Sequence, residues 1–318
     1  MTFFSILPLN TLRIFVTVWG LLWGSFLNVV IYRWPLGLSV VSPGSRCPAC
    51  MKPIAAYDNI PVLSYVLLRG KARCCGAKMG PRYALVEAMG GALSLAVFET
   101  LIAPSIGQVS DGKLLALFFA YFTLVMLLLA GTFIDLENML LPDFVTIGGT
   151  LIGFATLPLR DVPWQEAAIG AASGFFGVWL LFGVLYQKFR GRQGMGLGDA
   201  KLMALAGAWF GFRGLLFTLF VGAVQGTVAA IAVFLVRGRI EEPAAVQRER
   251  RELKEAADAG DAEAKSVLEE DSLLANEPAT GLLGAAIPFG PFLILAILEY
   301  LFLRPWLDEL YASAFGRS

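Results

Sequence analysis

The sequence predicts an all-α polytopic membrane protein with a small loop domain outside the bilayer. Three observations predict this class. Hydrophobic residues make up 57% of the 318 residues and charged residues only 16%, and the mean hydropathy is +0.68. Apolar stretches of about 20 residues recur along the chain, which is the length that an α-helix needs to cross a bilayer. The four cysteines all lie in one polar stretch, between residues 47 and 75.

About eight segments are apolar enough to be transmembrane helices. The first has neither a basic region nor a small-residue cleavage site before it, so we expect a retained helix and not a cleaved signal peptide. The expected spans are 11–31, 83–104, 114–134, 142–159, 166–187, 198–212, 215–236 and 286–303.

The distribution of basic residues predicts the orientation of these spans. Lys and Arg gather in the 32–82 loop, after the fifth span (188–192) and after the seventh (237–239), whereas the opposite loops hold mostly single charges. Loops rich in Lys and Arg stay in the cytoplasm. We therefore expect these loops on the cytoplasmic side and both termini on the other side.

The polar segments suggest how the chain is divided. Residues 32–82 are rich in Pro, Gly and Cys and lack helical periodicity, so we expect a small cytoplasmic domain that needs a staple. Residues 238–281 are highly charged, as in a solvated helical insertion or linker. The expected parts are a first transmembrane helix (1–31), the Cys-containing domain (32–82), a transmembrane core (83–237), the charged cytoplasmic insertion (238–281), and a last helix with its tail (282–318).

The composition excludes several classes of function. The chain has no histidine, which rules out Ser-His-Asp and Cys-His catalysis and the H-E-x-x-H zinc motif. Acid–base chemistry must then come from carboxylates, Lys, Tyr or Cys. Lys and Arg balance Asp and Glu at 25 each, so the net charge offers no electrostatic case for binding nucleic acid.

Aspartates stand where three predicted spans begin or end. Asp135 ends the third span, Asp143 opens the fourth, and Asp199 opens the sixth. Ionisable groups at such places are costly and tend to be functional. The predicted topology brings all three to the cytoplasmic face. Two neighbouring carboxyl groups share one proton, so one can activate water while the other protonates a scissile carbonyl.

Each of these residues also has a purely structural interpretation. Asp199 is suited to the first turn of a helix, where the helix dipole favours a negative charge. Asp143 follows Pro142 and fits helix capping better than catalysis. Gly196 and Gly198 permit a sharp turn beside which an extended substrate can lie. Lys201 could meet the substrate or extend to the membrane interface.

The two aspartates are expected at helix ends of opposite sign. Asp135 lies near a helix C-terminus, which disfavours a negative charge, and Asp199 near an N-terminus, which favours one. We therefore expect Asp135 to hold the shared proton more often, with Asp199 tending toward the role of base, although such a pair titrates as a unit.

The cysteines suggest a metal site. Cys47 and Cys50 have the C-x-x-C spacing, and Cys74 and Cys75 complete a set of four thiols. Clustering of this kind suggests a metal site or paired thiols. A cytoplasmic location disfavours a structural disulfide. A site with three thiolates and another ligand, or a loop without metal, remain alternatives.

Eight stretches, in the same order along nearly the whole chain, resemble the bacterial prepilin peptidases, which process type IV prepilins and type II secretion pseudopilins. The stretches are Gly24–Arg33, Cys47–Cys50, Asp58–Tyr65, Arg82–Glu87, Phe133–Asp135, Leu140–Asp143, Gly194–Lys201 and Ile287–Phe292.

This resemblance implies an aspartyl endopeptidase of the bacterial inner membrane with Asp135 and Asp199 as its catalytic pair. It would cleave the leader of a prepilin or pseudopilin just after a Gly, at the cytoplasmic face. Relatives with this cytoplasmic loop usually also methylate the new N-terminus with S-adenosylmethionine. No G-x-G-x-x-G motif locates that cofactor. Glu87 and the Gly90-Gly91 pair are candidates, although small residues there also suit helix packing.

The resemblance also implies a zinc site, because the family's two C-x-x-C pairs supply four thiolates for tetrahedral zinc. The cysteine pattern of this sequence departs from those two pairs. The first cysteine of the second pair falls on Ala72, and Cys74 stands next to Cys75 instead. Zinc remains the favoured interpretation. Without zinc, packing alone would hold the loop, and the case for methylation would weaken.

Two other function classes fit parts of the sequence. A transporter with broken helices could use an intramembrane carboxylate pair, but the acidic residues are expected at one face and not at the midplane. A non-enzymatic, zinc-stapled assembly factor would keep its function when both aspartates are replaced. The sequence does not identify the client protein or the role of the 238–281 insertion.

Overall fold

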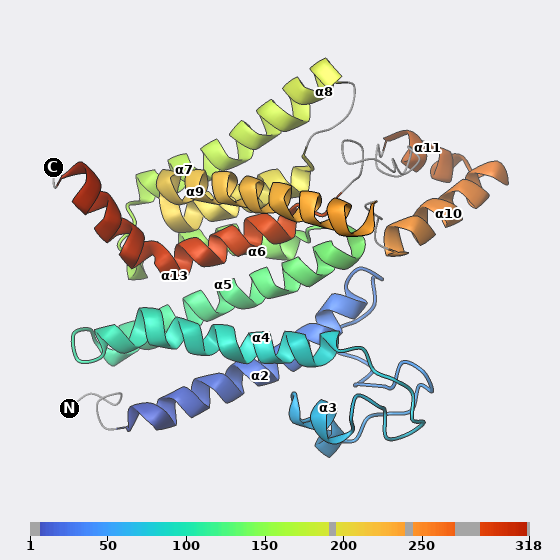
Figure 1. Cartoon of the computed structure of the whole chain (residues 1–318), viewed down its shortest axis with the longest axis horizontal. Coiled ribbons are helices and arrows are strands. Elements are labelled where there is room, and N and C mark those ends of the chain that lie inside the picture. The colour runs from blue at the N-terminus through green and yellow to red at the C-terminus, as the bar shows by residue number, and fades with distance from the viewer. Residues whose placement is uncertain (1–6, 191–194, 239–243, 271–286, 317–318) are drawn as a thin grey trace. The chain divides into compact units, whose positions relative to one another are not determined.

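The computed structural model describes residues 7–190, 195–238, 244–270 and 287–316 (Figure 1). Within these residues all regular secondary structure is helical, apart from three isolated β-bridges. This confirms the predicted all-helical membrane class. Gly194 of the glycine-rich loop and residues 271–281 of the charged insertion lie outside the described residues. The chain divides into two compact units, which are described separately.

Proline marks the start of four helices. Pro8, Pro81, Pro142 and Pro163 each stand immediately before the first helical residue. Proline lacks an N–H, which costs nothing where a helix has no acceptor to offer, and its fixed φ suits the first turn. These four boundaries therefore follow directly from local sequence.

The first unit contains residues up to 130 together with 158–160 and the chain from 305. Its helices are α2 (Leu9–Arg33), α4 (Arg82–Val97) with the π-helical η2 (Phe98–Ile102), and most of α5 (Asp111–Asn138). Helices α2 and α4 lie side by side (Figure 1). A Cβ on Gly20 would overlap the carbonyl of Gly90, and one on Gly24 would lie 2.8 Å from Cα of Glu87. Gly90 therefore serves helix packing.

The loop domain of the first unit connects α2 to α4. It contains a short 3₁₀ helix, η1 (Ala56–Asn59), one short α-helix, α3 (Leu63–Leu67), and two isolated β-bridges, Arg46 with Pro53 and Lys71 with Lys78.

The second unit contains residues 131–157 and 161–304. Its helices include α6 (Asp143–Ala155), α7 (Trp164–Val178) with the π-helical η5 (Trp179–Leu185) and α8 (Tyr186–Arg190), α9 (Leu197–Arg237), and α13 (Gly290–Phe315) up to residue 304. Helices α7 and α9 pack closely at glycines, because a Cβ on Gly207 would overlap the backbone of Gly170. The buried Trp209 donates from Nε1 to the Gly149 carbonyl oxygen at 2.9 Å, which joins α9 to α6.

The expected number of eight spans is not confirmed. Six helical segments of the described chain are long and apolar enough to cross a membrane. Helix α6 has only 13 residues. Helix α9 covers both the sixth and seventh expected spans, but its backbone is not helical at Gly211 (φ 66°, ψ −166°, a conformation that suits glycine), which divides it close to the boundary expected between these two spans. The six segments are Leu9–Arg33, Arg82–Ser105, Asp111–Asn138, Trp164–Leu185, Leu197–Val236 and Gly290–Leu310.

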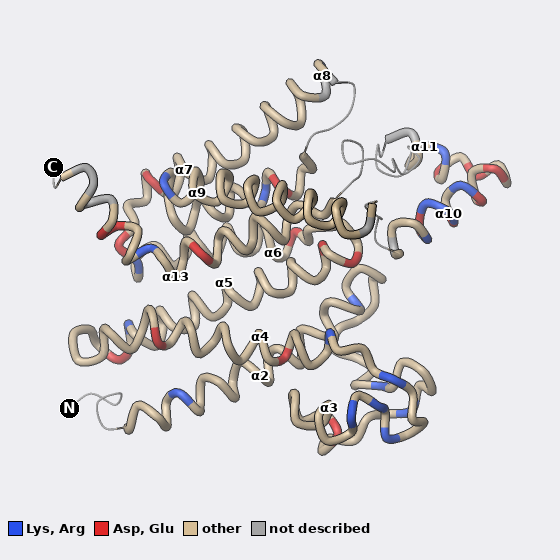
Figure 2. The backbone as a smooth tube through the Cα atoms, viewed as in Figure 1, with Lys and Arg blue, Asp and Glu red and all other residues tan. Residues whose placement is uncertain are grey.

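The described part of the charged insertion is helical, with α10 (Ala244–Asp258) packed on α11 (Ala262–Glu270). An ion pair at helical spacing joins Arg248 to Glu252 at 2.8 Å. Lys, Arg, Asp and Glu gather on α10, α11 and the loop domain, whereas the long helices carry few (Figure 2). The expected domain boundaries themselves remain a prediction.

Candidate active site and metal centre

Asp135 is held in the last turn of α5. Its side chain is buried, with 5% of the residue exposed. The backbone N–H of Gly290, the first residue of α13, donates a hydrogen bond to its carboxylate. The carboxylate therefore lies at the N-terminus of α13, which offers a partial positive charge.

Asp199 is held in the first turn of α9 and is also buried, at 9% exposed. Its Oδ2 accepts a hydrogen bond from the Gly196 backbone N–H at 3.2 Å. Asp199 thus occupies the first-turn position considered from sequence, and this hydrogen bond to the backbone before the helix also orients its carboxyl group.

The two carboxyl groups are close enough to interact electrostatically. Both belong to the second unit, and the side chain of Leu141 packs beside them. A Cβ on Gly198 would lie 3.0 Å from Cβ of Leu141, and one on Gly290 would lie 3.1 Å from its Cδ1. In a buried carboxyl pair of this kind, one group can be protonated while the other is ionised. Such a pair can act as a general acid and a general base.

The structure places both aspartates at the expected helix ends, Asp135 in the last turn of α5 and Asp199 in the first turn of α9. Asp135 also accepts a hydrogen bond from the N-terminus of α13, which the sequence did not predict. This second helix end offsets part of the expected contrast in helix dipoles, and the separate roles of the two aspartates remain a prediction.

Gly290 is the important neighbour that sequence reasoning missed. A Cβ at this position would lie 2.6 Å from Oδ2 of Asp135, closer than real contacts allow. Gly290 belongs to the Ile287–Phe292 stretch, which resembles the prepilin peptidases but to which the sequence assigned no role. That stretch was the one indication in the sequence that Gly290 matters. By contrast, a Cβ on Gly196 would make only an ordinary contact of 3.9 Å with Asp199. Close approach is thus required at Gly198 and Gly290 and not at Gly196.

Asp143 and Lys201 form an ion pair beside this site. Nζ of Lys201 donates to Oδ1 of Asp143 at 2.6 Å, and the Asp143 side chain is 62% exposed. Asp143 therefore stands in the first turn of α6, as expected, but its side chain makes no capping hydrogen bond there and pairs with Lys201 instead. A role for Lys201 in supporting the site remains a prediction.

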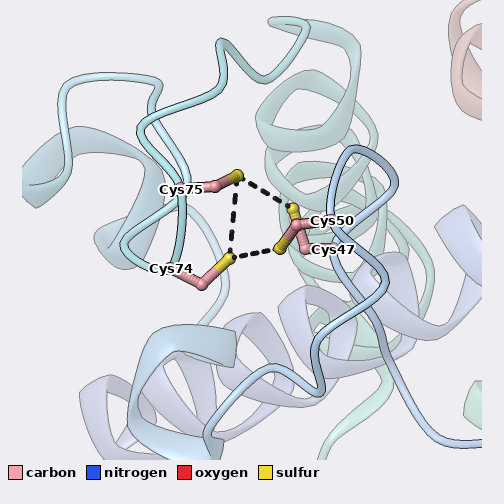
Figure 3. A group of neighbouring side chains, drawn as sticks. All are labelled: Cys47, Cys50, Cys74 and Cys75. Atoms are coloured by element: carbon pink, nitrogen blue, oxygen red, sulfur yellow. Dashed lines mark hydrogen bonds between the residues drawn. The ribbon is translucent and has the colours of Figure 1, made fainter.

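The four cysteines converge in the loop domain (Figure 3). Their sulfur atoms all lie within 4.8 Å of one another. Sγ–Sγ distances are 3.7 Å for Cys47–Cys75, 3.3 Å for Cys50–Cys74 and 3.9 Å for Cys74–Cys75. Four sulfurs at tetrahedral zinc–sulfur distance would be about 3.8 Å apart. The cluster can therefore hold a metal ion.

Two turns of the same design present these sulfurs. In the first, the Cys47 N–H donates to the Lys52 carbonyl oxygen at 2.9 Å. In the second, the Ala72 N–H donates to the Ala77 carbonyl oxygen at 2.8 Å. An isolated β-bridge flanks each turn. Ala72 is buried like Cys47 and occupies the equivalent backbone position.

This equivalence explains the altered cysteine pattern. Cys75 comes three residues after Ala72, as Cys50 comes three residues after Cys47. Position 72 has no thiol, and Cys74, the residue before Cys75, supplies one instead. The sulfur of Cys74 lies 3.3 Å from that of Cys50. The second turn therefore keeps its backbone form and supplies two thiols.

Backbone donors favour the thiolate form of Cys47. The N–H groups of Cys50 and Ala49 point at its sulfur and lower the pKa of Cys47 to about 6. Because the thiolate is the form that binds metal, this cysteine is prepared to be a ligand at neutral pH.

Two family models match the chain. The Bacterial Peptidase A24 N-terminal domain matches residues 18–101, which include the cysteine cluster, and the Type IV leader peptidase family matches residues 121–231, which include Asp135 and Asp199. The chain belongs to the type IV leader peptidase family. The resemblance recognised from the sequence is confirmed, as is the expectation that the chain is a peptidase. Gly290 lies beyond the residues that the family models match.

Relatives of this leader peptidase cover most of its length. A protein of Myxococcus xanthus (strain DK1622) is 36% identical over 93% of this chain and 91% of its own, and one of Pseudomonas putida is 33% identical with the same coverage. A protein of Neisseria gonorrhoeae is 37% identical over 70% of this chain and 82% of its own. Each is named "Prepilin leader peptidase/N-methyltransferase". No solved structure matches the chain.

Proposed function

We propose that this leader peptidase is an intramembrane aspartyl endopeptidase that removes the leader of type IV prepilins or type II secretion pseudopilins. Asp135 and Asp199 form its catalytic pair. The observation that carries the proposal is the pair of buried carboxyl groups, brought from the ends of α5 and α9 to where they interact, each oriented by a backbone N–H.

The pair hydrolyses a peptide bond with one shared proton. The ionised carboxylate removes a proton from water, whose oxygen attacks the scissile carbonyl carbon while the protonated carboxyl group donates its proton to the carbonyl oxygen. The tetrahedral intermediate then collapses, the C–N bond breaks, and the leaving amine takes up a proton. Burial keeps bulk water from competing for these protons.

The family and the apolar helices support the proposed substrate and location. The substrate has a basic leader that ends in Gly, followed by a largely apolar helix that can lie along the transmembrane segments. Cleavage occurs just after this Gly at the cytoplasmic face of the inner membrane. The names of the relatives support a prepilin substrate, and the six apolar helices support a multi-pass protein in a lipid bilayer.

A cleavage assay tests the peptidase proposal. Purified protein in detergent is mixed with a model prepilin, and the products are weighed by mass spectrometry. We expect one cut immediately after the Gly of the leader. Intact substrate, or cleavage elsewhere in the leader, would overturn the proposal.

A second activity, methylation of the new N-terminal amine, is supported by the names of the relatives. S-adenosylmethionine supplies the methyl group: the amine nitrogen bonds to the methyl carbon, the carbon–sulfur bond breaks, and S-adenosylhomocysteine and a proton are released. In the same assay, added S-adenosylmethionine should increase the mass of the mature product by one methylene.

The cysteine cluster is proposed to bind structural zinc through Cys47, Cys50, Cys74 and Cys75. The sulfur separations and the four-thiol donor set fit this ion. Such a site stabilises a small loop-built domain that has little core of its own.

The zinc site can be tested by exchanging ligand positions. Wild-type protein should carry about one zinc ion per chain by elemental analysis. Cys74→Ser should lose most of it, because a hydroxyl is a poor replacement for a thiolate. Adding Ala72→Cys should restore it, because position 72 matches Cys47. Full zinc content in the Cys74→Ser protein would contradict the assignment of this ligand.

A further inference from the structure

The loop domain holds an open cavity of about 370 Å³ that borders the metal centre, since Cys47 and Cys74 are part of its lining, and that extends beyond it to Tyr57 and Leu68. We call it the loop cavity. Ligand pockets typically start at about 300 Å³. Residues of the loop cavity that matter for its chemistry are Tyr57, Asp58, Ser64, Tyr65, Leu68 and Arg73. Three of them, Asp58, Ser64 and Tyr65, belong to the Asp58–Tyr65 stretch, which carried the family resemblance but has no part in the functions proposed so far.

A strained turn forms part of the segment that lines the loop cavity. Val62, between η1 and α3, has φ 61° and ψ −47°, and the Leu63 N–H donates to the Pro61 carbonyl oxygen at 2.6 Å. A β-branched residue rarely adopts positive φ. The carboxylate of Glu87 on α4 accepts the Val62 N–H at 2.7 Å and holds the turn. Backbone strain that is held in place in this way is a common mark of a functional site.

A hydroxyl group joins the two sides of this turn. Ser64 Oγ donates to the Tyr57 carbonyl oxygen at 3.2 Å and accepts the Ile60 N–H at 3.1 Å. η1 and α3 are therefore held together before any ligand binds. Pre-organised walls of this kind reduce the entropic cost of binding.

Opposite charges lie side by side in the lining of the loop cavity. Arg73 Nε donates to both carboxylate oxygens of Asp58 at 2.9 Å, and Asp58 is mostly covered while Arg73 is 59% exposed in its side chain. A zwitterionic amino-acid group presents a carboxylate for the guanidinium and an ammonium for the carboxylate. A ligand with such a group can therefore satisfy both partners through charge-assisted hydrogen bonds.

Aromatic and apolar side chains supply a different chemistry in the same lining. Tyr57 and Tyr65 offer ring faces, and Leu68 adds apolar surface. Tyr57 already carries the Arg73 guanidinium 5.8 Å from its ring centre, which shows that the ring is accessible to a planar or cationic group. Aromatic rings bind purine bases by stacking.

We propose that the loop cavity binds S-adenosylmethionine, with the amino-acid end of the cofactor at Asp58 and Arg73 and the adenine against Tyr57 and Tyr65. The inference rests on the methylation proposed above and gives that activity a location. It also changes the role of Glu87: this residue positions the strained turn and does not itself contact the cofactor.

Equilibrium binding of S-adenosylhomocysteine to the full-length protein in detergent, measured by calorimetry, tests the site without relying on turnover. Tyr57→Ala and Arg73→Ala should each weaken binding about tenfold or more. Tyr57→Phe keeps the ring and should bind within about twofold of wild type. Lys78→Ala is the matched control for Arg73, because Lys78 is an exposed cation of the same loop that does not line the loop cavity.

The outcomes separate this site from the functions on which it rests. Binding that survives both Tyr57→Ala and Arg73→Ala would overturn the site but leave methylation in place. Absence of binding to the wild type would overturn both, while leader cleavage is measured independently. If the variants fail to fold, photo-crosslinking of labelled S-adenosylmethionine to wild type decides: the label should map to residues 53–79, and labelling only elsewhere would overturn the site.

Discussion

Replacing either Asp135 or Asp199 by Asn is expected to lower the rate of leader cleavage by about 10³-fold or more. An amide can neither take the proton of water nor protonate the carbonyl, and acid–base catalysis of this kind contributes about 10² to 10⁴ in rate. Asparagine has nearly the same shape as aspartate, and its side-chain oxygen can still accept a hydrogen bond from the N–H of Gly290 or Gly196. The variants should therefore keep the local structure. Initial rates on a model prepilin in detergent measure the effect.

Asp143→Asn is the matched control for this experiment. Asp143 belongs to the same unit and opens the next helix, but its side chain is largely exposed and paired with Lys201. Exposed ion pairs contribute at most about 1 kcal/mol, so cleavage should stay within about fivefold of wild type. Thermal melting checks that all three variants are folded. If either Asp135→Asn or Asp199→Asn cleaves the substrate at the wild-type rate, the two aspartates are not a catalytic pair. That result would favour a non-enzymatic or transport role.

Gly290→Ala is expected to lower leader cleavage by about 10²-fold, because a displacement of about 1 Å in a catalytic group can cost that much. The new Cβ would lie 2.6 Å from Oδ2 of Asp135 and 3.1 Å from Cδ1 of Leu141. Neither distance is tolerable without movement, and the Asp135 carboxylate would have to leave the N-terminus of α13. The cleavage assay used for the aspartate variants measures the loss.

Gly177→Ala in α7 controls for the effect of adding a methyl group to a helical glycine. Nothing lies within 4 Å of a Cβ at that position. Cleavage should be unchanged and stability should rise by up to about 1 kcal/mol, since alanine favours helix more than glycine. If Gly290→Ala cleaves as fast as Gly177→Ala, the position of the Asp135 carboxylate is not critical and the geometry of the proposed pair is wrong.

The membrane class was predictable because a bilayer allows few solutions. Backbone groups inside lipid must be paired within the segment, so long apolar stretches become helices. Pro8, Pro81, Pro142 and Pro163 marked helix starts for an equally local reason. The number of spans was harder, since local hydropathy does not report that α6 ends after 13 residues. The break in α9 at Gly211, by contrast, lies close to the boundary expected between the sixth and seventh spans.

The carboxylates proposed as the catalytic pair were predictable as residues but not as a geometry. Charged groups at the ends of apolar helices identified Asp135 and Asp199, and the family resemblance selected them from three candidates. Gly290 follows Asp135 by more than 150 positions in the sequence. Its contact with the carboxylate exists only because α13 begins beside the end of α5, so the sequence could not predict that a second helix N-terminus acts on Asp135.

By itself, the sequence determined the chemistry available to this protein: an all-helical membrane chain, no histidine, two aspartates at span ends and four thiols in one loop. These are properties of composition and of local spacing. Only the tertiary structure decided how these groups meet. It placed Asp135 at a second helix N-terminus, showed that Ala72 takes the backbone position of a cysteine while Cys74 supplies the thiol, and formed the loop cavity from η1 and α3. Contacts between distant segments depend on packing, which no local pattern records.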